Sequence, residues 1–390
     1  MTTLGEVAEI SKLQWKPCDK EQKYIGLEHI DQGELTINGF GYSSKLKSNK
    51  FYFKTGDVLF GKLRPYFRKV WKAKFDGVCS TDIWVLKAKE NNDQNFLFYL
   101  VANPIFVSKS MGANTGTHMP RADWDFLKNT EWNIPSLPEQ RAIAAVLSSL
   151  DDKIELLREQ NKTLEATAQA IFKEWFVNFN FPGVGKMIDS EIGKIPEGWR
   201  VGKIKDLIDV LSGFAFQSSD FTQDGKYKLV TIKNVQDRYF DSETKDRLLK
   251  LPAKMPDYCK LGTGDILLSL TGNVGRVCLV NGENFLLNQR VAKVKAKNQI
   301  DYAFTYLLFL QDSIFSLLQS TASGTAQQNL SPIQTKEIEI IIANRKTLDQ
   351  FGKVANKLIQ KINDNNSQIQ TLSKLRDTLL PKLMKGEIRV

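Results

Sequence analysis

A heptad pattern of apolar residues runs through the middle of the chain, from Pro138 to Phe179. Apolar side chains return at alternating steps of three and four residues, and no glycine or further proline interrupts them. Such spacing predicts one long helix that buries a single seam against a partner helix. The seam comprises Leu147, Leu150, Ile154, Leu157, Asn161, Leu164, Ala168, Ile171 and Trp175, in which Asn161 is the polar position.

The C-terminal segment carries the same pattern and is the expected partner helix. Its seam comprises Ala355, Leu358, Ile362, Asn365, Ile369, Leu372, Arg376, Leu379 and Leu383. In an antiparallel pair we expect Asn161 opposite Asn365, because each buried amide requires a polar partner. This register sets Arg376 opposite a leucine. It also gives the pairs Leu147 with Leu379, Ile154 with Leu372, Leu157 with Ile369, Leu164 with Ile362, and Ala168 with Leu358.

An internal repeat relates the sequence before the first long helix to the sequence before the second. The triplet Thr55-Gly56-Asp57 returns 208 residues later as Thr263-Gly264-Asp265. The same offset relates Gly116-Thr117 to Gly324-Thr325, and Leu164 to Leu372. One register held over this distance indicates a tandem duplication of a globular domain followed by a long helix.

The boundaries follow from this repeat. We expect globular domains at 1–135 and 200–342, long helices at 136–180 and 343–390, and a linker rich in glycine and proline at 181–199. Short β-branched and aromatic runs predict strands, and longer apolar runs predict one helix in each domain. The expected strands are 56–60, 83–86, 265–270, 276–280 and 290–297, and the expected helices are 95–110 and 302–318. This mixture without a regular βαβ rhythm predicts an α+β fold.

Composition favours a polyanionic partner. The 390 residues carry a net charge of +10, and 42% of them are hydrophobic, which is enough to form packed cores. Four cysteines without CxxC spacing and two histidines argue against a zinc site or a disulfide framework. No apolar run approaches the length of a membrane span, so we expect a cytoplasmic protein that contacts no membrane.

Catalytic motifs are weak. The chain has no GxxxxGK[ST] phosphate loop. Asn103-Pro104-Ile105-Phe106 is similar to the Asn-Pro-Pro-Phe motif of adenine methyltransferases, but it lacks the second proline and no glycine-rich loop follows a strand; a helix kink is the better interpretation. Glu243-Thr244-Lys245 precedes the Pro256-Asp257 pair, which is the wrong order for a nuclease site. We therefore expect no catalytic residues and no bound metal or cofactor in this chain.

Several loops combine residue types that read DNA. Cations neutralise phosphates, arginine can clamp a guanine edge, and asparagine or glutamine can pair with adenine. The first domain offers Lys62, Arg64, Tyr66, Arg68, Lys69, Asn114, Thr115, Thr117, His118 and Arg121. The second offers Thr271, Asn273, Arg276, Gln327, Gln328 and Asn329 at equivalent positions. For any single residue, an ordinary solvated turn is an equally good interpretation, but as paired sets they favour DNA binding.

The first long helix contains LPEQRAIAAVLSSLDDKIELL and then LEATAQAIFKEWFVNF, and the chain ends in LRDTLLPKLMKGEIRV. These segments resemble the conserved regions of Type I restriction–modification specificity subunits. IPEGWRVGKIKDL resembles the entry into that family's second target-recognition domain. TGDVLFGKLRPYFRKV and TGDILLSLTGNVGRV are similar to parts of its recognition domains. The likeness covers nearly the whole chain. Arg376 departs from the apolar pattern of the helix seam, and this departure concerns only the local register of the helix pair.

This resemblance implies a non-catalytic subunit that binds double-stranded DNA. It implies two target-recognition domains, each reading half of a split target, and an antiparallel coiled coil of the two long helices that acts as a spacer and docks methylation subunits. S-adenosylmethionine and ATP would be used by the methylation subunits and a restriction subunit, which supply adenine N6 methylation, translocation and cleavage. A basic DNA-binding scaffold that works without methyltransferase partners would show the same loops and helices, and it remains the alternative.

Overall fold

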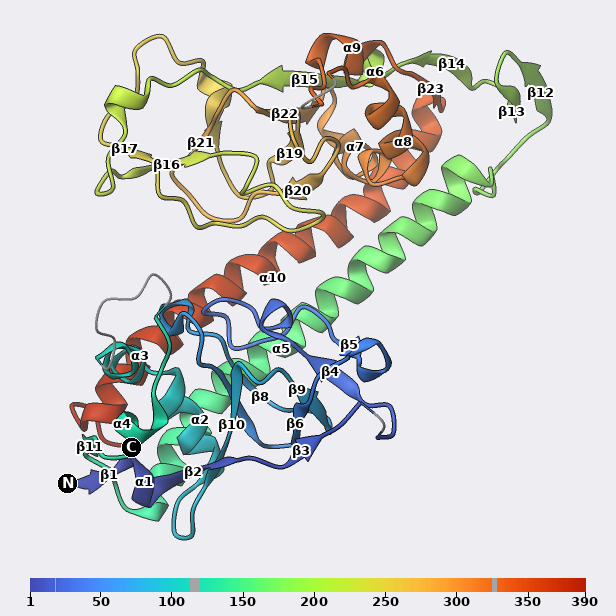
Figure 1. Cartoon of the computed structure of the whole chain (residues 1–390). Helices are drawn as coiled ribbons and strands as arrows, with labels where there is room; N and C mark the ends of the chain where they lie inside the picture. The colour runs from blue at the N-terminus through green and yellow to red at the C-terminus, as the bar shows by residue number, and fades with distance from the viewer. Residues whose placement is uncertain (18, 113–119, 325–327) are drawn as a thin grey trace. The chain divides into compact units, whose positions relative to one another are not determined.

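The computed structural model describes residues 1–17, 19–112, 120–324 and 328–390 (Figure 1). The chain divides into two compact units. The first unit joins Met1–Lys153 to Leu372–Val390, and the second is Ile154–Thr371. Each of the two long helices therefore contributes one part to each unit.

The first unit is built on a four-stranded antiparallel sheet in the order β2-β10-β7-β8, with a five-stranded sheet β3-β6-β9-β4-β5 and the pair β1-β11. Its strands are β1 Thr2–Thr3, β2 Ala8–Ser11, β3 Gln14–Trp15, β4 Lys23–Ile25, β5 Gly41–Tyr42, β6 Lys50–Phe53, β7 Val58–Gly61, β8 Val70–Lys72, β9 Gly77–Cys79, β10 Ile83–Ala88 and β11 Glu131–Trp132. Its short helices are α1 Leu4–Val7, η1 Leu27–His29, η2 Ser43–Lys45, η3 Pro65–Phe67, α2 Gln94–Ala102, α3 Pro104–Met111 and α4 Trp124–Leu127.

Within its described residues, the second unit repeats this topology without a counterpart of β3, with sheets ordered β15-β22-β19-β20 and β17-β16-β21-β18 and the pair β14-β23. Its strands are β14 Arg200–Lys203, β15 Ile208–Ser212, β16 Tyr227–Val230, β17 Arg247–Leu248, β18 Lys260–Leu261, β19 Ile266–Ser269, β20 Val277–Leu279, β21 Phe285–Leu287, β22 Val291–Ala296 and β23 Glu339–Ile342. Its short helices are α6 Ile204–Leu207, η5 Ser218–Asp220, η6 Asp257–Cys259, η7 Gln299–Asp301, α7 Tyr302–Phe309, α8 Asp312–Thr321 and α9 Pro332–Glu337.

The duplication predicted from the sequence is therefore visible element by element. β10 and β22 begin 208 residues apart, as do α2 and α7. Both units also contain one parallel strand pair, β4 with β9 and β16 with β21, inside the second sheet. The mixed sheets and helices confirm the predicted α+β fold, and the five predicted strands lie on β7, β10, β19, β20 and β22.

The helices expected at 95–110 and 302–318 are each divided in two, and the kink expected at Asn103-Pro104 is confirmed. In the first unit α2 ends at Ala102 and α3 begins at Pro104. Asn103 adopts an extended backbone, and its side-chain oxygen accepts from the Ile105 amide at 2.8 Å. A residue before proline disfavours the helical region, and proline is well suited to a first helical position, so the chain bends here. In the second unit the corresponding break falls at Leu310 and Gln311, between α7 and α8.

The segment 181–199 is not the featureless connection that its glycines and prolines suggested. It forms the hairpin β12 Met187–Ser190 and β13 Gly193–Pro196. Phe181 and Trp199 stack with ring centroids 5.0 Å apart, and both are buried in the core of the second unit. The segment is therefore anchored by aromatic side chains that flank its turn residues.

The two long helices are α5 Leu137–Phe172, which continues into the π-helical turn η4 Lys173–Val177, and α10 Arg345–Lys385. Within the first unit, the beginning of α5 and the end of α10 share a core that includes Leu147, Leu380 and Leu383. Within the second unit, the end of α5 shares a core with the beginning of α10 through Ala168, Ala355 and Ile362. The helices thus run antiparallel within each unit.

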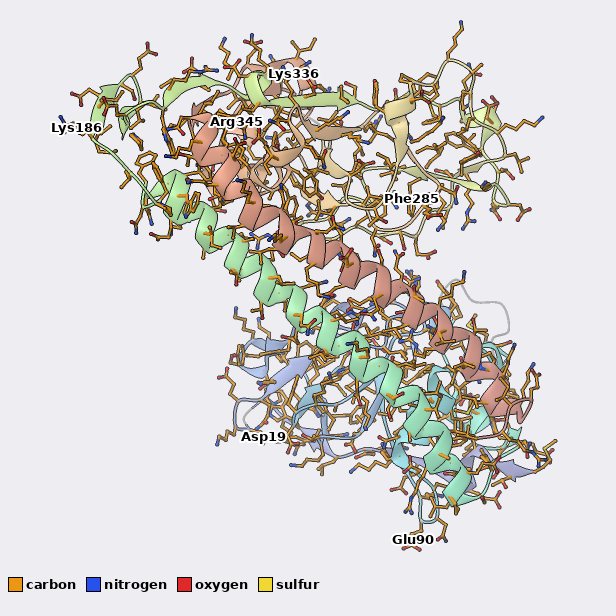
Figure 2. The ribbon with its side chains drawn as sticks, turned by 180° about the vertical axis from the view of Figure 1, so that it is seen from behind. Asp19, Glu90, Lys186, Phe285, Lys336 and Arg345 are labelled. Carbon is orange, nitrogen blue, oxygen red and sulfur yellow. The ribbon has the colours of Figure 1, made fainter. Side chains whose placement is uncertain are left out.

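Polar layers interrupt the seam in both units. In the second unit, Asn365 donates to Asn161 at 2.9 Å, in the layer expected from the register, and Asn161 donates to Asn366 at 2.7 Å. Outside the seam, Arg345 at the start of α10 (Figure 2) donates to Asp301 of η7 at 2.8 Å. In the first unit, Arg376 is 2% exposed and donates to Asp151 at 2.8 Å. The arginine that disturbed the sequence pattern is therefore accommodated by a carboxylate on the facing helix.

Candidate nucleic-acid interface

In the first unit, the turn between β7 and β8 is bonded to the segment that precedes α4. The amide of Arg64 donates to the carbonyl of Pro120 at 2.8 Å. The amide of Ala122 donates to the carbonyl of Lys62 at 2.8 Å. Leu63 and Arg121 form an isolated antiparallel bridge between these bonds. Two loops that are far apart in sequence are thus joined into one structure, which we call the first corner (62–69 and 120–122).

The second unit builds the equivalent structure between the β19–β20 turn and the segment before α9. The amide of Leu330 donates to the carbonyl of Leu270 at 2.8 Å. The amide of Gly272 donates to the backbone carbonyl of Gln328 at 3.4 Å. Thr271 and Asn329 form the bridge. All these positions lie 208 residues after those of the first corner, so this second corner (270–276 and 328–330) is its structural repeat.

The first corner presents cations and one exposed aromatic ring. Tyr66 is 48% exposed and packs edge-on against Phe67. Arg64 has a left-handed backbone, with φ of 52°, and precedes Pro65. Burial and the neighbouring Arg121 guanidinium lower the pKa of Lys62. Arg121 forms an ion pair with Asp82 at 3.2 Å. Two cations held close together suit a polyanionic ligand, which would relieve their mutual repulsion.

Two of the predicted cations are engaged inside the unit. Arg68 donates to the carbonyl of Gly33 and forms an ion pair with Asp377 at 3.3 Å. Lys69 donates to the carbonyl of Leu27 at 2.6 Å, and burial lowers its pKa. Their head groups therefore bind the protein's own oxygens in this structure.

The second corner presents exposed amides, whereas its hydroxyl and its cation are held by the protein itself. Asn273 and Gln328 are exposed. The hydroxyl of Thr271 donates to the side-chain oxygen of Asn329 at 2.9 Å across the bridge. Arg276 donates to the side chain of Gln236. Of the remaining predicted site residues, Asn114, Thr115, Thr117, His118 and Gln327 lie outside the described residues.

Sequence reasoning missed the residues that hold these corners in place. Asp82, Gly33 and Gln236 come from other loops and contact Arg121, Arg68 and Arg276, respectively. No motif identifies them, because their role depends on tertiary contacts between distant segments. The 208-residue offset applied to the loops themselves was the signal that located the corners.

Residues 1–166 and 196–370 each match the family model described as Type I restriction modification DNA specificity domain. The chain belongs to this family. It is 30% identical to the Type I restriction enzyme MjaIX specificity subunit of Methanocaldococcus jannaschii, over 77% of this chain and 71% of that protein. It is 25% identical to the HindI specificity subunit of Haemophilus influenzae, over 94% of this chain and 95% of that protein.

A solved structure shows the same fold as this specificity-domain chain. The Type I restriction–modification system S subunit from M. genitalium aligns with a TM-score of 0.54 and 17% identity, covering 98% of this chain and 94% of that one. The family match over residues 1–166 and 196–370 and the 30% identical relative confirm the family assignment made from the sequence. It places the chain among specificity subunits, which are non-catalytic, and not among the catalytic ones.

The described residues offer little that resembles a cofactor or metal site. No group of three or more histidine, cysteine or acidic residues suited to a metal ion occurs among them. Cys79 and Cys278 are buried, and burial raises the pKa of both thiols. Within the same described part of the chain, no helix is long and apolar enough to cross a membrane.

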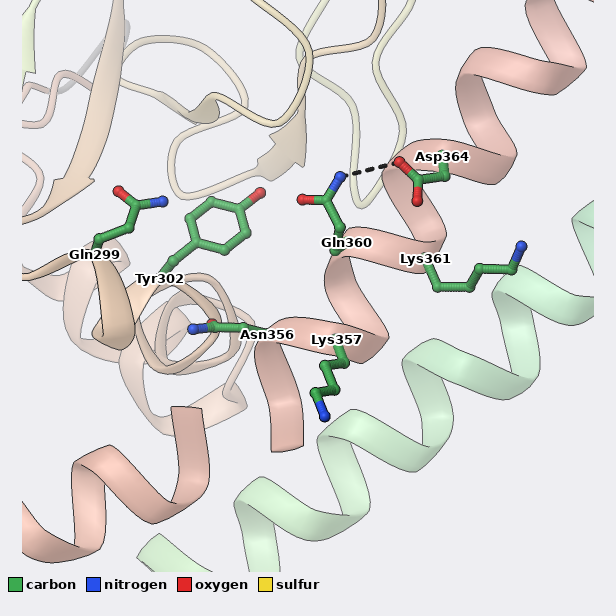
Figure 3. Close-up of a pocket in the computed structure, with 7 residues that line it drawn as sticks. All are labelled: Gln299, Tyr302, Asn356, Lys357, Gln360, Lys361 and Asp364. Carbon is green, nitrogen blue, oxygen red and sulfur yellow. Dashed lines mark hydrogen bonds between the residues drawn. The ribbon is translucent and has the colours of Figure 1, made fainter. Parts of the chain in front are cut away.

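A shallow hollow beside α10 is lined by polar residues that already serve the fold (Figure 3). Asn356 accepts from the Ala303 amide at 2.8 Å and donates to the Ile300 carbonyl at 2.9 Å, so it fastens the start of α7 to α10. The hydroxyl of Tyr302 donates to the Gly264 carbonyl at 2.7 Å. Gln360 donates to Asp364 at 3.0 Å. These groups hold helix, turn and strand together, and we assign no ligand to the hollow.

Proposed function

We propose that this chain is the DNA-reading subunit of a Type I restriction–modification complex, in which each corner reads one half of a bipartite target. The observation that carries the proposal is the repeated backbone bridge, Leu63 with Arg121 and Thr271 with Asn329, on which the two units place different side chains. The names of the curated relatives, all specificity subunits, support it. One frame with two sets of polar groups is what two unrelated half-sites require.

The chemistry of the two corners suggests how each half-site is recognised. Arg64 and Arg121 suit a guanine edge, to which a guanidinium donates two hydrogen bonds. Asn273 and Gln328 suit an adenine edge, because an amide both donates and accepts. Lys62 and the overall charge of +10 favour phosphates, which position the protein without reading sequence.

In this proposal 1–135 and 200–342 are the target-recognition domains, and the long helices set the gap between half-sites. Methylation subunits dock on these helices and use S-adenosylmethionine to methylate adenine N6. A restriction subunit adds ATP-dependent cleavage. The chain itself contributes target recognition and no chemistry, so the catalytic power of the assembly depends entirely on its partners.

Reconstitution tests the proposal. The purified chain, given methyl donor and double-stranded DNA, is expected to transfer no methyl groups. Co-expressed with a methylation subunit from the same host, it is expected to co-purify with that subunit and to methylate adenines in one split sequence. Methyl transfer by the chain alone would refute the non-catalytic role. DNA binding without any stable methylation subunit would favour the free scaffold instead.

A further inference from the structure

In each unit an arginine, Arg68 within the first corner and Arg238 next to the second, links the corner to a carboxylate on a long helix of the same unit. Arg68 has a φ of 47° and Arg238 a φ of 59°. This left-handed region is unfavourable for residues with a Cβ atom. Such a conformation persists where the surroundings fix it, and it occurs preferentially at functional positions.

Arg68 ends the turn of the first corner. Its amide donates to the Pro65 carbonyl at 2.8 Å, which closes the turn η3. Its guanidinium donates to the carbonyl of Gly33 and to Asp377 on α10, the latter at 3.3 Å. The Arg68 side chain is only 17% exposed. The turn that carries Arg64 and Tyr66 is thus tied to α10 through one guanidinium.

Asp377 is itself held in place by the buried polar layer of the helix pair. Arg376 forms an ion pair with Asp377 at 3.2 Å and donates to Asp151 on α5 at 2.8 Å. The hydroxyl of Tyr99 on α2 donates to the same Asp151 at 2.7 Å. A continuous set of hydrogen bonds therefore runs from α2 through α5 and α10 to the turn of the first corner.

The second unit has an analogous link in which the arginine comes from a neighbouring loop. The Arg238 amide donates to the carbonyl of Val277, the residue after Arg276 of the second corner, at 2.8 Å. The guanidinium of Arg238 lies 3.8 Å from Glu165 on α5. Gln169 also donates to Glu165, at 3.2 Å. By the 208-residue offset, Glu165 corresponds to a position one helical turn before Asp377, so both carboxylates lie on the equivalent part of their helices.

We propose that Arg68 and Arg238 are positioning residues that fix each DNA-reading corner against the long helix of its own unit and so determine how well that corner discriminates its half-site. This inference rests on the proposed function. The side chains that read bases must be held at hydrogen-bond distance from a base edge, and a small tilt of the corner breaks that geometry. The arginine acts through the turn and contacts no base.

The test uses the complete complex of this chain with its methylation subunits and measures DNA binding in two ways. One is the affinity for the intact target relative to targets mismatched in one half or the other, and the second is the dependence of affinity on salt. Arg68→Met and Asp377→Asn are each expected to lower discrimination at the first half-site about tenfold, a part of what a bidentate base contact supplies. The double variant is expected to discriminate no worse than Asp377→Asn alone, because Asp377→Asn already breaks the link to Arg68 as well as the ion pair with Arg376.

Discrimination at the other half-site and the salt dependence are expected to stay unchanged in these variants. Arg238→Met and Glu165→Gln are expected to act in the same manner on the second half only. Lys47→Met, at an exposed lysine of the first unit, is the matched control and is expected to change neither ratio. Thermal unfolding of each variant is measured in parallel. If Arg68→Met folds poorly, Asp377→Asn replaces it in the test, because asparagine has nearly the same shape as aspartate.

Two results would overturn the inference while leaving the proposed function intact. If Arg68→Met weakens binding to all DNA equally and reduces the salt dependence, whereas Asp377→Asn has no effect, Arg68 contacts a phosphate. If neither variant changes discrimination, the link is purely structural. By contrast, a wild-type complex that recognises no bipartite target would refute the proposed function itself.

Discussion

The corner at Leu63 and Arg121 and the corner at Thr271 and Asn329 share their backbone bonding and differ in side-chain chemistry. The first presents cations and an aromatic ring, and the second presents amides. The backbone bonding is the same in both corners, whereas the exposed side chains differ, with Tyr66 in the first and Asn273 and Gln328 in the second. Specificity in this architecture can therefore change without a change of fold.

The Thr-Gly-Asp triplets show what the frame requires. Gly56 and Gly264 have φ of 92° and 90°, a region that favours glycine. Asp57 accepts from the Lys54 amide at 2.8 Å, and Asp265 accepts from the Gly262 amide at 2.9 Å, which closes the same turn before β7 and β19. The strand that leads into each corner starts from this turn, so its sequence is retained.

The helix pair differs between the units in the same instructive way. In the first unit its polar layer is ionic, with Arg376 and Asp151, and in the second it is an amide layer, with Asn161 and Asn365. Both layers provide hydrogen-bond partners for buried polar groups on the seam. They differ in how much the free energy of unfolding is expected to fall when one partner is removed.

The largest effect is expected from lengthening the spacer while leaving both corners untouched. Four residues inserted within 162–166 extend α5 by about 6 Å, and one base pair rises about 3.4 Å. We expect methylation of the original motif to be lost and a motif with a gap one or two base pairs longer to replace it, with both half-sites unchanged. Some stability is lost because the insertion rotates the seam. Sequencing of methylated adenines provides the measurement, and an unchanged gap with intact activity would show that the helices do not measure the DNA.

Breaking the ionic layer is expected to have the next largest effect. Arg376→Ala removes a buried guanidinium and leaves Asp151 with Tyr99 as its partner. We expect a loss of about 3 kcal/mol in the free energy of unfolding, at the lower end for a broken buried pair because Asp151 is partly exposed. Urea denaturation measures this loss, with the exposed Lys374→Ala as control. A loss below about 1 kcal/mol would mean that the layer adds little to stability.

Breaking the amide layer is expected to cost less and to be repairable. Asn161→Leu leaves the amide of Asn365, which is 1% exposed, without its acceptor, and we expect a loss of about 1–3 kcal/mol. Adding Asn365→Leu is expected to bring stability back to within about 1 kcal/mol of the wild type, since two apolar partners can replace a hydrogen-bonded pair. The same urea series tests both variants. A double variant less stable than the single one would contradict this interpretation.

The smallest effect is a difference between two equivalent glycines. A Cβ atom at Gly56 meets no atom within 4 Å, whereas at Gly264 it lies 3.0 Å from the side-chain nitrogen of Asn363. Gly56→Ala is expected to cost about 1–2 kcal/mol through its backbone conformation alone. Gly264→Ala is expected to cost more, because Asn363 must also shift. Thermal denaturation of the two variants side by side checks the order, and equal losses would show that Asn363 moves freely.

The sequence was informative where the structure depends on periodicity or on the repeat. The heptads located α5, α10 and the Asn161–Asn365 layer, and the offset located both corners. It was misleading where local composition and tertiary contacts disagree. Phe181 and Trp199 pack a segment that glycine and proline marked as a linker, and the apolar run 302–318 is divided into two helices at Leu310 and Gln311 although it contains no proline. The partner of Arg376 was not visible either, because Asp151 lies one position off the seam.

Independent reading of two half-sites is tested most directly by mapping methylated adenines in a host that carries the complex with Arg64→Ala or with Gln328→Ala. We expect Arg64→Ala to relax preference in one half of the motif only and Gln328→Ala to relax the other half only. A base contact contributes about 1–3 kcal/mol to discrimination. The gap between the halves is expected to remain the same in both variants. If either single substitution changes preference in both halves, the two corners do not read DNA independently, and the comparison between the units loses its functional meaning.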